Sequence, residues 1–202
     1  MREEANGFTL IELVTVIALV SIFLLFLVKL NITGNNEGQQ VKAAALILAS
    51  SFDGTRGQAI AGNTYAKVFL DTSSDLKFRR IAIIKQTQNV WKTEREILLP
   101  ERTFVLSPND LAECLNNTDL SAYPYPEEEA ILQGEIVDGY CFTFTPEGHL
   151  SHAAAAILGI GYGVKASDEI KIKKDTNIYG LLVTAMGKRV ILESKNAIKG
   201  AI

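Results

Sequence analysis

Residues 8–28 read FTLIELVTVIALVSIFLLFLV, and they set the architecture of the whole chain. As an α-helix with a rise of about 1.5 Å per residue, this run would be roughly 31 Å long, close to the thickness of a bilayer's hydrocarbon core. Apolar side chains surround the helix on every side, so it is not an amphipathic surface helix. Lys29 ends the run and is expected at the lipid head groups. The run therefore predicts a membrane-spanning helix near the N-terminus.

Glu12 is the one charged residue inside this run. A carboxylate near the bilayer centre costs about 2.5–3.5 kcal/mol on insertion scales. One turn from the helix start the cost is smaller, because the positive end of the helix favours an anion there. Two interpretations follow: an interfacial glutamate, or a glutamate that pairs with a cationic partner inside the apolar layer.

Residues 7–13, GFTLIEL, resemble the processing site of type IV prepilins and pseudopilins. In that family a membrane aspartyl peptidase cuts after the glycine and N-methylates the new N-terminal phenylalanine. The resemblance implies cleavage between Gly7 and Phe8, and N-methylation of Phe8. It also implies that Glu12 is the assembly residue, which pairs with the amino terminus of a neighbouring subunit.

Two other kinds of N-terminal segment compete with this interpretation. A secretory signal peptide has a basic start, an apolar region of about 7–15 residues and a small-x-small cleavage site. Here the run is longer, the start MREEANG is not basic, and KLNITGNNEG supplies no such site. A plain signal anchor would leave Glu12 unexplained. The acidic leader, in which Glu3 and Glu4 outweigh Arg2, is where the sequence departs from the basic leaders usual in the family.

Residues 31–38, NITGNNEG, contain two glycines and three asparagines, so a flexible joint is expected there. Residues 39–61 are expected to form an amphipathic helix that packs on a sheet, because apolar residues recur at helical spacing. These residues are Val41, Ala44, Ala45, Leu48, Phe52 and Ala59. The expected division is a leader at 1–7, a transmembrane assembly helix at 8–30, a joint at 31–38 and a head domain at 39–202.

Beyond residue 63 the chain is rich in β-branched and aromatic residues, so the predicted fold class is α+β with an antiparallel β head. Expected strands are 64–70, 78–85, 90–99, 103–106, 140–145, 169–173, 177–184 and 188–193. Residues 152–164 are ambiguous, because AAAA favours helix and LGIGYGV favours strand. Residues 107–138 contain three prolines and an acidic run, and are expected to form a long exposed insertion.

Three segments of the head resemble the GspH/FimT subgroup of minor pilins and pseudopilins. The first is TRGQAIAGNTYAKVFLD at 55–71, the second is FTPEGHL at 144–150, and the third is NIYGLLVTAMGKRVIL at 177–192. In that subgroup a Phe-x-Pro-x-Gly turn is followed by a last strand pair closed by a glycine and a basic residue. The matching positions of the first segment are Arg56, Ala59, Ile60, Asn63 and Val68.

No catalytic constellation stands out in the sequence, so we expect no enzyme, no cofactor and no metal. His149 and His152 are expected to be surface histidines, and the acidic run Glu127–Glu129 a solvated stretch. Gly159, Gly161 and Gly163 lack the spacing of a dinucleotide-binding loop and are expected in a strand where backbones approach closely. The net charge of −3 gives no basic field over the whole molecule.

Cys114 and Cys141 are the only two cysteines. A head outside the cytoplasm lies in an oxidising compartment, where a disulfide between them is allowed. Closing a loop of about 28 residues would stabilise the fold by around 3–4 kcal/mol in the chain-entropy model. Two buried thiols are the alternative, and both states stay open.

The resemblance implies a structural subunit, a minor pilin or pseudopilin of a type II secretion system or a type IV pilus. Its implied partners are a prepilin peptidase, other pilin or pseudopilin subunits, the inner-membrane assembly platform and the lipid bilayer. Its implied location is the inner membrane, with the head in the periplasm, and the filament after assembly. One alternative is a competence-type pilin whose head binds DNA, through the basic cluster Lys171, Lys173, Lys174, Lys188 and Arg189. A membrane-anchored ligand-binding domain is the other.

Overall fold

The computed structural model describes residues 10–33, 36–152, 154–166, 169–173 and 177–202. By its internal contacts the chain divides into two compact units, residues 1–36 and residues 37–202. The first unit contains helix α1 (Leu10–Thr33), and the second holds all the sheets. We call the second unit the head.

The two long helices reach further than the sequence predicted. α1 continues to Thr33 and α2 (Asn36–Gly62) begins at Asn36, so helix enters the expected joint at 31–38 from both sides. Residues 34 and 35 lie outside the described residues. Glu37 lies in the first turn of α2, where a negative charge is favoured by the helix dipole.

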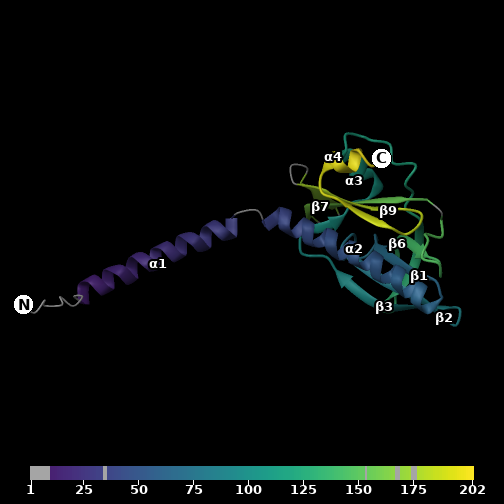
Figure 1. Ribbon diagram of the computed structural model, residues 1–202, viewed down its shortest axis with the longest axis horizontal. Coiled ribbons are helices and arrows are strands. Elements are labelled where there is room, and N and C mark those ends of the chain that lie inside the picture. The colour runs from purple at the N-terminus through teal and green to yellow at the C-terminus, as the bar shows by residue number, and fades with distance from the viewer. Residues whose placement is uncertain (1–9, 34–35, 153, 167–168, 174–176) are drawn as a thin grey trace, which may run out of the picture. The chain divides into compact units, whose positions relative to one another are not determined.

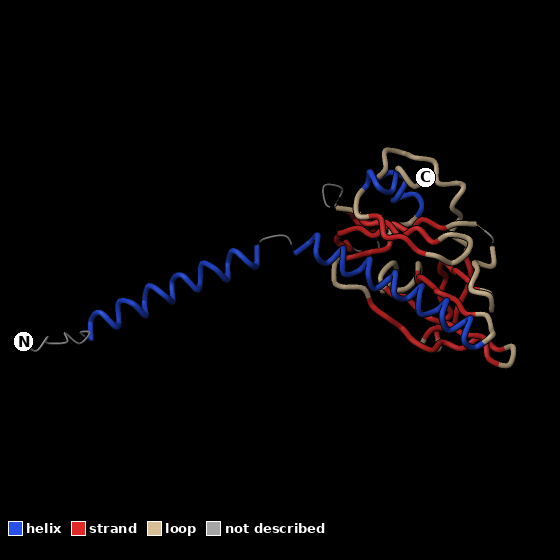
Figure 2. Tube along the Cα trace, in the orientation of Figure 1, coloured by secondary structure: helices blue, strands red, loops and turns tan. Residues whose placement is uncertain are grey.

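The head contains two antiparallel sheets, which we call sheet A and sheet B (Figures 1 and 2). The strands of sheet A follow the order β3 (Val90–Leu98), β2 (Arg80–Thr87), β1 (Ala66–Asp71), β6 (Glu135–Phe144) and β5 (Glu127–Leu132). Sheet B has the order β10 (Arg189–Leu192), β9 (Tyr179–Val183), β7 (Ala156–Ala166) and β4 (Thr103–Val105), and β8 (Glu169–Ile172) pairs with β7. A last short helix, α4 (Lys195–Lys199), follows β10.

These elements confirm the predicted α+β class with an antiparallel head. Each of the eight expected strands overlaps an observed strand, with its ends shifted by a few residues. The ambiguous residues 152–164 resolve as strand from Ala156 onward, so the LGIGYGV pattern prevails over the alanines.

The predicted exposed insertion at 107–138 was wrong. This segment forms helix α3 (Pro108–Cys114) and strand β5, and Leu111, Leu115 and Leu132 from it are fully buried. Ser107 caps α3, since its hydroxyl accepts a hydrogen bond from the Asp110 backbone N–H at 3.1 Å. The prolines and acidic residues that suggested exposure lie between apolar residues that complete the core.

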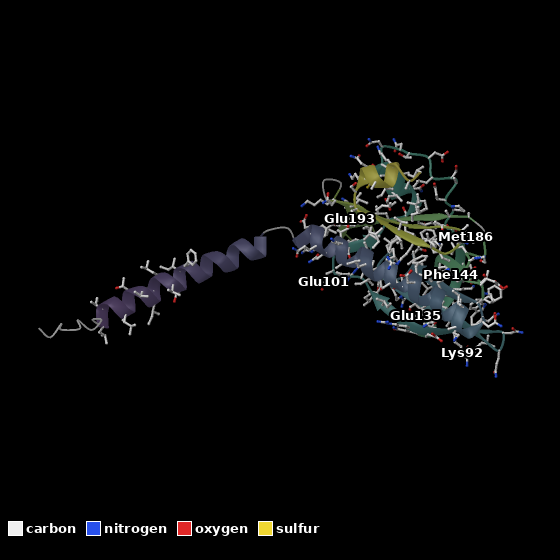
Figure 3. The ribbon with its side chains drawn as sticks, in the orientation of Figure 1. Lys92, Glu101, Glu135, Phe144, Met186 and Glu193 are labelled. Carbon is white, nitrogen blue, oxygen red and sulfur yellow. The ribbon has the colours of Figure 1, made fainter. Side chains whose placement is uncertain are left out.

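The main core lies between α2 and both sheets. The predicted apolar stripe of α2 is confirmed, since all six of its residues are buried. At its centre Phe52 packs on Phe142 and Phe144, with ring centroids 5.5 and 6.1 Å apart. Phe144 is labelled within the head in Figure 3. Burial of these rings attaches α2 to the end of β6.

Candidate functional site

The described side chains of α1 are all exposed, and most of them are large and apolar. Leu10 and Ile11 are 83% and 73% exposed, and Val14, Ile17 and Phe23 are each more than half exposed. Successive helical residues are rotated by about 100°, so these positions surround the helix rather than form one stripe. An apolar helix of this kind needs lipid or other apolar helices to cover it.

The hydroxyl groups of α1 bond to the backbone of the same helix. Thr15 Oγ1 donates to the carbonyl oxygen of Ile11 at 2.6 Å, and Ser21 Oγ donates to that of Ile17 at 2.8 Å. A hydroxyl transferred to an apolar environment is costly unless it finds such a partner. These two side chains are therefore compatible with apolar surroundings.

The residues of the processing motif lie at the edge of what the structure describes. Gly7 and Phe8 lie outside the described residues, and Glu12 lies near the start of α1 with a side chain that is also outside them. Their implied roles stay predictions. Within the described ranges no helix has both the length and the hydropathy needed to cross a membrane.

The two cysteines lie in different parts of the core. Cys114 belongs to the cluster around α3, with Leu111 and Leu115, whereas Cys141 lies on β6 in a cluster with Phe69 and Val137. Both residues are described, and no disulfide joins them in the structure. Burial raises the pKa of the Cys141 thiol to about 12, against the opposing effect of Lys67 nearby. This thiol is therefore not nucleophilic at neutral pH.

The two histidines do not form a metal site. His149 is in the turn after β6, where its backbone N–H lies 3.4 Å from Thr145 Oγ1. His152 is half-buried, and loss of hydration lowers its pKa below the usual value. Nowhere in the described ranges do three His, Cys, Asp or Glu side chains cluster as metal ligands.

The basic cluster of the C-terminal region is divided by acidic partners from α2. Lys173 Nζ lies 2.9 Å from a carboxylate oxygen of Glu37, and Arg189 Nε lies 2.5 Å from that of Asp53. Lys174 lies outside the described residues. Two of the four described basic residues are thus paired with α2, and the other two, Lys171 and Lys188, are exposed.

The predicted close approach at the strand glycines is confirmed for Gly159 and Gly163. A Cβ on Gly159 would lie 2.6 Å from Leu111 Cδ1 of α3, and one on Gly163 would lie 2.8 Å from the Lys171 carbonyl oxygen of β8. Glycine on β7 therefore lets α3 and β8 pack directly against the strand.

The three head segments that resemble the GspH/FimT subgroup meet at one junction. Arg56 Nε, on α2, donates to the carbonyl oxygen of Gly148 at 2.9 Å. Gly148 belongs to the segment FTPEGHL. Gly187, in the β9–β10 turn, lies against both Gly148 and Arg56. A Cβ on Gly187 would lie 2.1 Å from the Gly148 oxygen. The three segments therefore pack together in one unit, which joins α2 to both sheets.

Asn63 has a conformational role at the end of α2. Its φ of 44° is in the left-handed region, which asparagine tolerates better than most residues. The Thr64 N–H donates to the Ala59 carbonyl at 3.1 Å, and the Asn63 N–H donates to that of Ile60 at 3.2 Å. These bonds terminate the helix in a Schellman-type cap and direct the chain into β1.

Sequence reasoning missed a buried ion pair in sheet A. Arg80 Nε lies 2.8 Å from Asp71 Oδ2, with the side chains 5% and 0% exposed. The same carboxylate accepts the backbone N–H groups of Ser73 and Ser74, each at 3.0 Å. Such hydrogen bonding is what a buried charge requires.

A hollow of about 400 Å³ on sheet A was also missed. It is lined mainly by Lys67, Phe69, Ile84, Trp91, Glu128 and Cys141. The acidic run 127–129 is exposed as predicted, but Glu128 forms an ion pair with Lys67. Lys67, between Ala66 and Val68 of β1, was the one sequence signal of this site.

No family model matches the chain, and no curated protein matches it in sequence. Among solved structures, the chain is similar to the type IV minor pilin FimU of Pseudomonas aeruginosa, with 14% identity, a TM-score of 0.44, and coverage of 78% of this chain and 91% of that one. It is also similar to the minor pseudopilin EpsH from the type 2 secretion system of Vibrio cholerae. That match has 12% identity, a TM-score of 0.48, and coverage of 76% of this chain and 97% of that one. At such identities and TM-scores the likeness assigns no function to this chain.

Proposed function

We propose that this chain is a minor pilin or pseudopilin subunit, which enters a pilus-like filament through its N-terminal helix. The observation that carries the proposal is α1, a mostly apolar helix whose described side chains are exposed on all sides and which begins within the segment GFTLIEL. Lipid covers such a helix before assembly, and neighbouring apolar helices cover it in a filament. The proposed machine is a type II secretion system or a type IV pilus.

The proposal includes processing at the membrane. A prepilin peptidase cuts between Gly7 and Phe8 and methylates Phe8, with the head in the periplasm and α1 in the inner membrane. Glycine at the cut suits a peptidase that must approach the backbone closely, because it has no side chain to obstruct the enzyme. Methylation leaves the terminal amine cationic, so the amine can still pair with a carboxylate.

Glu12 is the carboxylate proposed for that pairing. In a low-dielectric helix bundle an unpaired carboxylate is strongly penalised, whereas a paired one is tolerated. Pairing with the Phe8 amine of a neighbouring subunit therefore selects one axial register of the helices. Selection here comes from the penalty on wrong registers rather than from high affinity.

Co-expression with a prepilin peptidase tests the proposal. The intact mass is expected to fall by that of residues 1–7 and to rise by one methyl group, with N-methylphenylalanine as the new terminus. Gly7→Val is the matched control and is expected to remain uncut, because a β-branched side chain blocks close approach. An unchanged mass for the unmodified sequence would overturn the proposed processing.

A further inference from the structure

Sheet A curls until its first and last strands, β3 and β5, come together. Thr93 Oγ1 of β3 donates to the Ile131 carbonyl oxygen of β5 at 3.3 Å. Gln133 Nε2, just after β5, donates to Glu96 Oε2 of β3 at 2.9 Å. The five strands therefore surround an interior, which an apolar cluster partly fills. The cluster consists of Phe69, Ala82, Ile84, Leu132, Val137 and Cys141.

The hollow of about 400 Å³ on sheet A lies beside this cluster. Phe69, Ile84 and Cys141 belong to both the cluster and the lining of the hollow. Its other apolar lining residues are Trp91, Ala130 and Ile131. Small-molecule sites have volumes of about 300–1,000 Å³, and an engineered apolar cavity of about 150 Å³ holds benzene. The hollow therefore has room for a molecule of one or two rings.

Charges of both signs surround the hollow. Lys67 pairs with Glu128, and the Lys67 ammonium lies 4.1 Å from the centroid of the Trp91 ring. The exposed charged residues of the two adjoining strands are Lys92, Glu94 and Arg95 on β3, and Glu127, Glu128 and Glu129 on β5. Because cations and anions are mixed, the hollow selects neither an anion nor a cation. A neutral ligand leaves the ion pair of Lys67 and Glu128 intact.

Glu128 supplies a hydrogen-bond acceptor at the hollow. A carboxylate has about four lone-pair sites, so Glu128 can accept from a ligand while its Oε2 accepts from Lys67. Its side chain is 41% exposed and lines the hollow, so a ligand there can reach it. The Cys141 thiol adds no charge, since burial raises its pKa to about 12. An apolar ring with one N–H or O–H group matches this combination.

The geometry of the seam favours a free molecule over an added strand. The edge of β5 at the seam faces β3, and its Ile131 carbonyl oxygen already accepts from Thr93. A peptide that pairs by its backbone needs an edge whose N–H and C=O groups are free. Aromatic walls, by contrast, suit an aromatic ring, because such rings pack well edge to face or offset. Phe69 and Trp91 supply these walls.

We propose that this hollow binds a small neutral aromatic molecule that carries an N–H or O–H group. Its ring packs among Phe69, Ile84 and Trp91, and its donor group faces Glu128. The site lies wholly in the head, so it stands whether or not the chain enters a filament.

Trp91 is the only tryptophan in the chain, so its emission reports on the hollow. The full chain in detergent micelles is titrated with anthranilamide, a neutral aromatic amide that absorbs light where tryptophan emits. We expect a saturable fall in Trp91 emission and a matching rise in emission from the probe. Absence of a saturable change would overturn the proposal.

Charged analogues test the preference for a neutral ligand. Anthranilate has a carboxylate in place of the carboxamide, and it is expected to bind at least about tenfold more weakly, because its charge loses hydration in the hollow. Benzylamine, a cation, is expected to displace anthranilamide at least about tenfold less effectively than neutral benzamide for the same reason. Equal binding of anthranilate and anthranilamide, or equal displacement by benzylamine and benzamide, would contradict the proposed ligand class.

Filling the hollow tests where the probe binds. Ala130→Phe is expected to abolish the saturable energy transfer, because the larger side chain occupies the hollow that Ala130 lines. Ala122→Phe is the matched control, because Ala122 is exposed in a turn before β5 and does not line the hollow. Urea unfolding monitored by circular dichroism checks that both variants are folded. Unchanged energy transfer in a folded Ala130→Phe chain would place the probe elsewhere and overturn the proposal.

A substitution at Glu128 tests the hydrogen bond without filling the hollow. Glu128→Gln is expected to weaken binding of anthranilamide at least about fivefold, because an amide oxygen is a weaker acceptor than a carboxylate. Glu101→Gln is the control, because Glu101 is exposed and lies beyond the end of β3. Calorimetric titration supplies affinities that do not depend on fluorescence. Equal affinities in the two variants would show that the donor group does not face Glu128.

Discussion

Arg56 on α2 donates a hydrogen bond to the Gly148 carbonyl oxygen, 2.9 Å away in the turn after β6. The β9–β10 turn closes on the same pair, and the Leu150 N–H donates to the Ala185 carbonyl at 2.9 Å. One side chain therefore positions the end of the long helix against a turn from each sheet.

Arg56→Ala is expected to lower the free energy of unfolding of the head by about 1.5–3 kcal/mol, the usual contribution of a hydrogen bond to a charged group. Urea denaturation monitored by circular dichroism measures this change. Lys42→Ala is the control, because Lys42 is an exposed residue of the same helix. If both variants lose the same small amount of unfolding free energy, the Arg56 hydrogen bond does not stabilise the junction.

Asp71→Ala is expected to destabilise the head by about 3–5 kcal/mol, because it leaves the buried Arg80 charge with only a longer contact, from Nη1 to Glu96 Oε2 at 3.8 Å. The double variant Asp71→Ala with Arg80→Met removes both charges and is expected to recover part of this loss. Thermal unfolding of the two single variants and the double variant measures the coupling. Strictly additive losses would show that the pair does not act as a unit.

The Cys141 thiol is expected to make stability depend on alkaline pH. Its pKa is raised to about 12 in the folded head, above a value of about 8.5 in the unfolded chain. The contribution of this thiol to the free energy of unfolding is fully present below the unfolded pKa. It is lost as the pH rises toward the folded pKa, because between the two values only the unfolded thiol ionises readily. Urea denaturation at pH 7.5 and pH 10 is therefore expected to show a larger fall in the free energy of unfolding for the unmodified chain than for Cys141→Ala. Equal falls would contradict this assignment.

Glu12→Ala is expected to insert into the membrane normally and to enter filaments poorly, because the paired carboxylate is lost while the apolar helix is kept. Membrane fractionation and immunoblotting of sheared filaments separate the two effects. Thr15→Ala, which removes a hydroxyl that bonds only within α1, is the control and is expected to assemble. Normal incorporation of Glu12→Ala would remove the proposed role of this residue.

Local sequence patterns were sufficient to predict most of the helices and strands. The alternation and β-branched content of β1, β2 and β9 predicted these strands, since each buries side chains in a pattern that sequence can display. The stripe of α2 was predicted for the same reason. By contrast, the prolines and glutamates of 107–138 indicated exposure, although Leu111 and Leu132 in that segment complete the core.

The hollow on sheet A could not be predicted from the sequence, for a different reason. It forms because the sheet curls and brings Thr93 beside Ile131, which are remote in sequence and not paired in a ladder. The curl arises from accumulated strand twist and from the irregular register between Ile83 and Ile84. Neither feature leaves a local pattern in the sequence.

The attachment of α2 has a mechanical consequence. Glu37, Asp53 and Arg56 bind the helix to the rest of the head near its start and in its second half, and the apolar stripe fills the length between them. A pull applied at the N-terminal end of α2 along its axis loads these contacts together, in shear, rather than one after another. Resistance to force then follows the rate of unfolding of the whole head, because forced unfolding is governed by that rate.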